Sequence, residues 1–219
     1  MNKHITRLVW LVSLLPVIYV VLIWKQLPEK VAMHFDINGE PDRYGNKTEL
    51  AFMTGILFLL SVGVYYLLAN INRIDPKRYA MENTSRFRKI GFAVAVFMSG
   101  LTCFIIYSSK NGGSKMDTSL ILAAVSFLLA VIGNYMPNLK PNYFAGMRLP
   151  WTLEDPENWK ATHALAGKIW FAGGILLGIG CFVLPAKAAF VVFMTAVAAM
   201  VLIPAVFSWR FYMNKKKGG

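Results

Sequence analysis

The stretch NYFAGMRLPWTLEDPENWKATHALAGKIW, residues Asn142–Trp170, decides the fold, because it is the longest polar and aromatic passage in a chain made mostly of apolar blocks. Pro150 interrupts any helix before it, since proline has no amide donor and its ring clashes with the preceding turn. Thr152–Asp155 has the pattern of a capped helix start, and Asp155-Pro156 offers a second start with proline in the first helical position. A helix from there can run unbroken into the next apolar block.

On that helix, aromatic or small residues and one histidine recur at spacings of three or four residues: Trp159, His163, Ala166 or Gly167, and Trp170. Residues at this spacing share one face of a helix. Tryptophan prefers the membrane interface, because its ring is apolar and its N–H is polar. We therefore expect an amphipathic entry helix that lies at the interface.

The rest of the chain is strongly apolar. Of its 219 residues, 56% are hydrophobic and 16% are charged, and the mean hydropathy is +0.48. A soluble domain carries roughly 25% charged residues, and a membrane span needs about 20 mostly apolar ones. Six blocks fit spans, at residues 5–24, 50–71, 90–108, 118–136, 167–184 and 188–209. The sequence predicts an all-α integral membrane protein with six transmembrane helices and no separate soluble domain.

The net charge of +12 is interpreted as a sign of topology and not of direct nucleic-acid binding. Cytoplasmic segments of membrane proteins are enriched in Lys and Arg. With both termini in the cytoplasm, 16 of the 23 Lys and Arg fall on the inner side. We then expect two units: residues 1–90, with the larger outer loop 25–49 and a basic inner loop, and a core of residues 91–219, with the inner loop 137–166.

The outer loop holds a short alternating pattern at Val31–Phe35, which is typical of a strand, followed by a turn at Asp36–Gly39. It is mildly acidic, which favours cationic or amphipathic ligands, although outer loops also simply avoid Lys and Arg. His34, Asp36 and Asp42 carry metal-binding groups, but their spacing matches no strong metal-site pattern. We predict neither a metal nor a cofactor.

Catalysis is not expected from this sequence. Glu154, Asp155 and Glu157 lie close to His163, but only threonine hydroxyls stand beside them as nucleophiles, and a glycine-rich phosphate loop is absent. No span has a charged residue near its middle, which argues against a proton-coupled transporter. Arg148, among aromatic residues, must reach a phosphate or pair with a carbonyl or carboxylate. The alternative left open is an enzyme or lipid-handling protein that contacts an anionic headgroup through Arg148, Lys160 and His163.

Two groups of motifs resemble the SdpI family of bacterial membrane immunity proteins. The main group is Gly133–Pro137, Asn142–Leu153, Trp159, Thr162, His163 and Gly167. The outer loop looks like the domain that often precedes this core, through Leu27-Pro28, His34-Phe35, Gly39, Pro41-Asp42 and Lys47. The resemblance implies a multi-pass protein of the bacterial plasma membrane that protects against a secreted killing peptide. In the best-known member, toxin also leads to capture of a small winged-helix repressor at the membrane.

The resemblance and the residue patterns together give two candidate sites. The first is a toxin-binding site in the outer loop, with His34, Phe35, Asp36, Gly39 and Asp42. The second is an inner site for a protein partner or membrane lipid, with Asn134, Asn142, Tyr143, Phe144, Gly146, Arg148, Pro150, Trp151, Trp159, Thr162 and His163.

Overall fold

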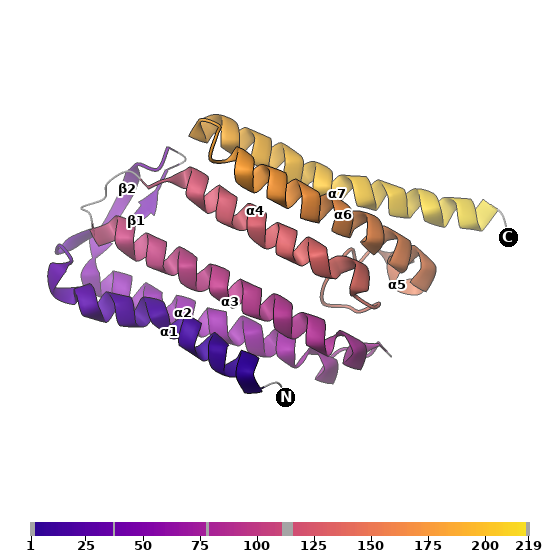
Figure 1. Ribbon diagram of the computed structural model, residues 1–219, viewed down its shortest axis with the longest axis horizontal. Coiled ribbons are helices and arrows are strands. Elements are labelled where there is room, and N and C mark those ends of the chain that lie inside the picture. Colours follow the sequence, from indigo (N-terminus) through magenta and orange to yellow (C-terminus); the bar gives the residue numbers. More distant parts are fainter. Residues whose placement is uncertain (1–2, 37, 78, 111–115, 218–219) are drawn as a thin grey trace.

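Six long helices dominate the computed structural model, which describes residues 3–36, 38–77, 79–110 and 116–217 (Figure 1). Each of the six is long and apolar enough to cross a membrane, which confirms the predicted fold class. They are α1 (Lys3–Ile23), α2 (Lys47–Ala69), α3 (Ala80–Lys110), α4 (Thr118–Tyr135), α6 (Pro156–Gly180) and α7 (Ala186–Lys217). Shorter helices are η1 (Trp24–Gln26), η2 (Ile71–Arg73), η3 (Met136–Asn138) and α5 (Pro150–Glu154).

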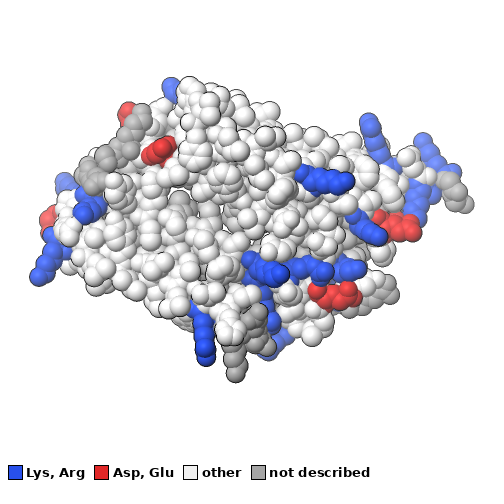
Figure 2. All heavy atoms as spheres, viewed as in Figure 1, with Lys and Arg blue, Asp and Glu red and all other residues white. Residues whose placement is uncertain are grey.

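The helices form two groups of three. Helices α1, α2 and α3 pack on one another, α6 packs between α4 and α7, and contacts between α3 and α4 join the groups (Figure 1). The described chain ends and α5 lie at one end of the bundle, whereas a β-hairpin lies at the other. In Figure 2 the middle of the visible face carries few charged residues, and Lys and Arg gather toward the end that holds α5. This distribution suits a protein whose middle is surrounded by lipid.

Glycines let α4 and α6 approach until their backbones touch. A Cβ atom on Gly133 would lie 2.6 Å from the backbone nitrogen of Phe171, and one on Gly174 would lie 2.5 Å from the carbonyl oxygen of Ser126. Membrane helices lack a strong hydrophobic drive to associate and rely on such close packing. The pair α4–α6 is therefore the rigid element on which the loop between these helices is built.

Two prolines inside spans each free a backbone carbonyl, because proline cannot donate to the residue four positions earlier. Pro204 leaves the carbonyl of Met200 free, and Nε1 of Trp170 on α6 donates to it at 2.9 Å. Pro16 leaves the carbonyl of Val12 free, and the hydroxyl of Ser99 on α3 donates to it at 2.6 Å. Both prolines thus create links between helices where no water is present to satisfy the carbonyl.

The hairpin consists of β1 (Lys30–Phe35) and β2 (Pro41–Asn46), paired antiparallel. The first strand and its turn are as predicted, with Ile37 outside the described residues, but the second strand was not predicted. The hairpin is held to the bundle because the Ser109 hydroxyl donates to the carbonyl of Ala32 at 2.8 Å, and the N–H of Met116 donates to the carbonyl of Gly39 at 2.7 Å. Its position is therefore fixed by α3 and by the start of α4.

The start of α6 confirms one sequence expectation and corrects another. The carboxylate of Asp155 accepts the N–H of Glu157 at 2.9 Å, so Asp155-Pro156 begins an unbroken helix as predicted. Thr152 does not cap that helix, because Pro150 already starts α5 and the Thr152 side chain turns back to Leu149. On the aromatic face of α6, Trp159 and His163 are buried inside the protein and do not face lipid, and the depth of this helix in the membrane stays a prediction.

Candidate functional site

The segment between η3 and α5 is held in place by two asparagines that replace secondary structure. Oδ1 of Asn142 accepts the N–H groups of Phe144 at 2.9 Å and Ala145 at 2.8 Å, and the side chain is fully buried. Asn83 on α3 forms two hydrogen bonds with the backbone of Lys140. Its Oδ1 accepts the N–H at 2.9 Å, and its Nδ2 donates to the carbonyl at 3.0 Å. A buried amide with satisfied partners fixes a single loop conformation. The loop is therefore fixed internally by Asn142 and attached to α3 by Asn83.

His163 on α6 forms a hydrogen bond with the backbone of this loop. Its Nδ1 lies 2.8 Å from the carbonyl of Trp159, and its Nε2 accepts the N–H of Met147 at 3.0 Å. The ring is therefore neutral, with its proton on Nδ1, and both nitrogens are occupied by backbone. The rings of Trp159 and His163 are stacked, with their centroids 3.9 Å apart. This geometry gives His163 a structural role and leaves neither nitrogen free for the acid–base chemistry considered from the sequence.

Gly146 fits the loop over that histidine because it has no side chain. Its φ is +102°, in the region that L side chains avoid. A Cβ atom there would lie 2.2 Å from Nε2 of His163. Gly146 is thus required both by backbone conformation and by the closeness of the ring.

A second polar network joins α5, α6 and α7. Asn158 is fully buried, and its Oδ1 accepts the hydroxyls of Thr162 at 2.9 Å and Ser208 at 2.8 Å. Trp151 on α5 donates from Nε1 to the same Ser208 hydroxyl at 3.0 Å, and its ring stacks on Tyr212 of α7. The predicted residues Trp151 and Thr162 are therefore linked through Ser208 of α7 and Asn158 of α6.

An ion cluster closes the same end of the bundle. Nζ of Lys215 lies 2.9 Å from carboxylate oxygens of both Asp155 and Glu157. Burial raises the pKa of Asp155, but the hydrogen bonds from Lys215 and from backbone N–H groups hold that pKa below its ordinary value. The C-terminal turn of α7 is thereby attached to the first turn of α6.

The surface of the loop is formed by the remaining predicted residues. Tyr143, Arg148 and Pro150 are exposed, and Asn134 is exposed on α4, whereas Phe144 packs partly into the core. Arg148 donates to the carbonyl of Tyr143 at 2.9 Å. Lys77 lies over the Tyr143 ring, with its Nζ 5.1 Å from the ring centre. The exposed part of the motif is therefore aromatic and cationic.

At the opposite end, the hairpin residues have distinct roles. His34 and Asp42 are exposed and form an ion pair at 2.6 Å when the histidine is protonated. The Asp36 carboxylate closes its own turn by accepting the N–H groups of Asn38 and Glu40, each at 2.8 Å. Phe35 is half-buried, and Gly39 is buried with φ of +78°. Within the described ranges, no three His, Cys, Asp or Glu side chains gather as metal ligands would.

The residues that sequence reasoning missed are the partners of the motif: Asn83, Lys77, Asn158 and Ser208. Asn158 lies four positions before the predicted residue Thr162 on the same helix, so helical spacing alone could have included it. Asn83 and Ser208 lie 57 and 50 residues from their partners, and nothing local to them indicates that contact.

Together these features define a multi-pass helical membrane protein with an anchored hairpin at one end and a side-chain-fixed loop at the other. Residues 138–208 match the model of the SdpI/YfhL protein family, and residues 11–59 match that of a domain of unknown function (DUF1648). The chain is thus similar to the SdpI family, most clearly over residues 138–208, and it is a multi-pass protein of the bacterial cell membrane.

Two relatives extend this result. The chain is 22% identical over 202 residues to Immunity protein SdpI of Bacillus subtilis (strain 168), which covers 91% of this chain and 90% of that protein. It is 31% identical over 78 residues to an uncharacterized protein of Archaeoglobus fulgidus, which covers 36% of this chain and 42% of that protein. No solved structure matches the chain significantly.

Proposed function

We propose that this protein is a non-enzymatic membrane immunity protein that binds a secreted killing peptide at its hairpin end, outside the cell. The observation that carries the proposal is the similarity to Immunity protein SdpI across 91% of the chain, which includes both the hairpin and the loop at the other end. Homology of this extent supports a role in membrane immunity. The identity of the peptide and the residues that recognise it belong to the proposal.

The hairpin surface suits an amphipathic peptide. Strand β2 presents an exposed carboxylate, guanidinium and aromatic ring in succession, from Asp42, Arg43 and Tyr44. Exposed aromatic and arginine side chains are those that contribute most at protein interfaces. His34 on β1 lies beside Asp42, so both strands contribute to this surface. A peptide held here is kept from inserting into the bilayer.

The test is survival of a sensitive host that expresses the full chain and is challenged with the killing peptide against which SdpI-like proteins protect. We expect the wild type to protect, and Tyr44→Ala combined with Asp42→Asn to lower the tolerated peptide concentration by about tenfold, as for loss of one interface anchor. Lys187→Gln, in the first turn of α7 at the same end, is the control and should protect fully. Full protection by the double variant at normal expression would contradict recognition by the hairpin.

We further propose that the loop at the other end faces the cytoplasm and docks a small winged-helix repressor when peptide is bound. The exposed Tyr143 and Arg148 are available for such a contact, and Lys77 beside the Tyr143 ring adds a second cation. In the same host, tagged protein should co-purify the repressor in the presence of peptide, and Arg148→Ala should abolish this without affecting survival. Loss of survival with Arg148→Ala would instead make the loop part of immunity itself.

The alternative of a lipid-modifying enzyme is less well supported. It requires Arg148, Lys160 and His163 to act on one headgroup, but both ring nitrogens of His163 are bound to backbone atoms. Lys160 lines a surface groove that neither Arg148 nor His163 reaches.

A further inference from the structure

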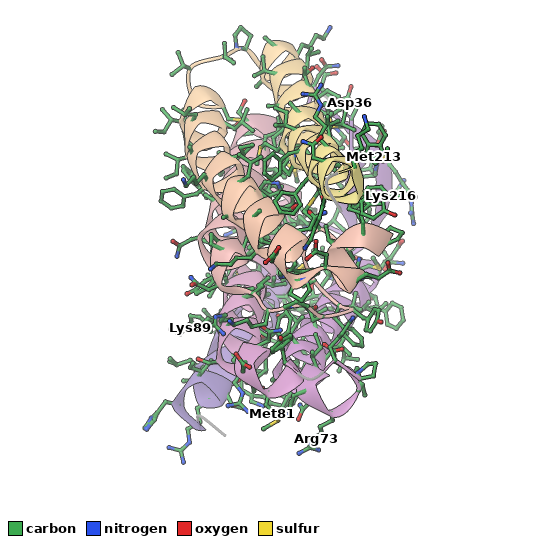
Figure 3. All side chains as sticks on the ribbon, turned by 90° about the vertical axis from the view of Figure 1, so that its right-hand side faces the viewer. Asp36, Arg73, Met81, Lys89, Met213 and Lys216 are labelled. Carbon is green, nitrogen blue, oxygen red and sulfur yellow. The ribbon has the colours of Figure 1, made fainter. Side chains whose placement is uncertain are left out.

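A groove of about 470 Å³ lies at the α5 end of the bundle, beside the fixed loop. One wall is formed by Arg86 on α3, another by the segment Pro137–Pro141, and the third by the first two turns of α6, including Lys160. Figure 3 looks onto this end, with Met81 and Lys89 of α3 on one side and Met213 and Lys216 of α7 on the other. The groove lies between the two helix groups, close to the hydrogen bonds between Asn83 and the backbone of Lys140.

The rim of the groove is cationic and unneutralised. Arg86, Lys140 and Lys160 line it, and within the described part of the chain none of the three forms an ion pair. The single acid in the lining, Glu157, already pairs with Lys215 at 2.9 Å. Three cations from three separate elements thus surround one opening without a described counter-charge. Such a site favours a ligand with a negatively charged phosphate.

The floor of the groove is apolar. Pro137 is exposed there, and the nearly buried Leu139 and Trp159 lie behind it; Nε1 of Trp159 is already bound to the carbonyl of Leu139 at 2.8 Å. A lining that is mostly apolar between the cations does not suit a small hydrated anion by itself. It suits a ligand whose anionic group is joined to an apolar part.

The position of the groove favours a lipid over a soluble ligand. It opens beside the first turn of α6, a helix that continues directly into an apolar span, so that it lies at the depth of lipid headgroups. Basic pockets between transmembrane helices on the cytoplasmic side are suited to anionic lipid headgroups. We propose that this groove is a binding site for an anionic phospholipid, with the phosphodiester held by Arg86, Lys140 and Lys160 and the glycerol and upper acyl chain on the apolar floor.

This proposal goes beyond the immunity function, and its test needs no killing peptide. The full-length protein in detergent is titrated with phosphatidylglycerol or with phosphatidylcholine, and bound lipid is counted by native mass spectrometry. We expect the wild type to prefer phosphatidylglycerol. The variant Lys140→Gln with Lys160→Gln should bind it at least tenfold more weakly, since each cation near a lipid phosphate contributes about fivefold. Both lysines are exposed, so the variant is expected to fold.

Two controls decide the outcome. Lys25→Gln with Lys187→Gln removes the same charge at the hairpin end and should leave binding unchanged, and Lys140→Arg with Lys160→Arg should retain it. Equal loss in both Gln variants, or no loss in the groove variant, would overturn the site. Displacement of the lipid by millimolar glycerol 3-phosphate or inorganic phosphate would show that the ligand is a soluble phosphate and would overturn the proposed lipid. Displacement by an acidic peptide would assign the groove to a protein partner, which also overturns it.

Discussion

At the scale of single residues, the loop depends on the absence of a side chain at Gly146. Gly146→Ala is expected to cost about 1–3 kcal/mol of unfolding free energy, because the φ of +102° is strained for alanine and its Cβ would meet the His163 ring. The measurement is thermal or denaturant unfolding in detergent.

Gly55→Ala is the matched control for this prediction. Gly55 lies inside α2, and a Cβ there meets nothing within 4 Å. We expect it to be neutral or to gain up to about 1 kcal/mol, as alanine is the better helix former. If Gly146→Ala proves as stable as Gly55→Ala, the loop adapts to the added methyl group and His163 does not hold the loop in place.

The sequence could predict which residues belong to the loop site, but not what most of them do there. Asn142, Trp159 and His163 were all expected at one site, and the structure brings them together. Their roles differed from expectation, because His163 and Asn142 bind backbone groups, which no sequence pattern displays. Thr152 was expected to cap a helix, yet the earlier proline at position 150 had already fixed where α5 begins.

At the scale of elements, the carbonyl that Pro204 leaves free on α7 allows a test of the hydrogen bond between α6 and α7. Trp170→Phe removes the N–H that satisfies the Met200 carbonyl and should cost about 0.6–1.7 kcal/mol, the range of hydrogen bonds between membrane helices. In a Pro204→Ala background the cost should be smaller, because the new backbone N–H can satisfy the same carbonyl. The measurement is a double-mutant cycle of unfolding free energies. Additive effects would contradict the proposed link.

Elements were predictable where hydrophobic blocks define them, and less so at their ends. All six spans were located, because a bilayer demands long apolar runs. Helix α3 begins at Ala80, whereas the apolar block that predicted it begins at residue 90, because the first turns of this helix are polar and basic. Strand β2 was missed because its sequence, PDRYGN, has no apolar alternation and forms a strand only by pairing with β1.

At the scale of the whole molecule, the proposed function requires that the two ends of the bundle face opposite sides of the membrane. The described termini and α5 share one end, and the hairpin lies at the other. The division into units of residues 1–90 and 91–219 stays a prediction, and α3, which packs on α1 and α2, crosses that boundary. The side of the membrane that each end faces was inferred from charge alone.

The most direct test of the central claim is labelling of single cysteines in intact cells with a membrane-impermeant thiol reagent. The background carries Cys103→Ala and Cys181→Ala, and the reporters are Glu40→Cys on the hairpin and Tyr143→Cys on the loop, both at exposed positions. The account predicts that the reporter at position 40 is labelled in intact cells, whereas that at position 143 is labelled only after the cells are permeabilised. Labelling at position 143 in intact cells would contradict the six-span orientation, and with it the assignment of the hairpin as the outer, peptide-binding face.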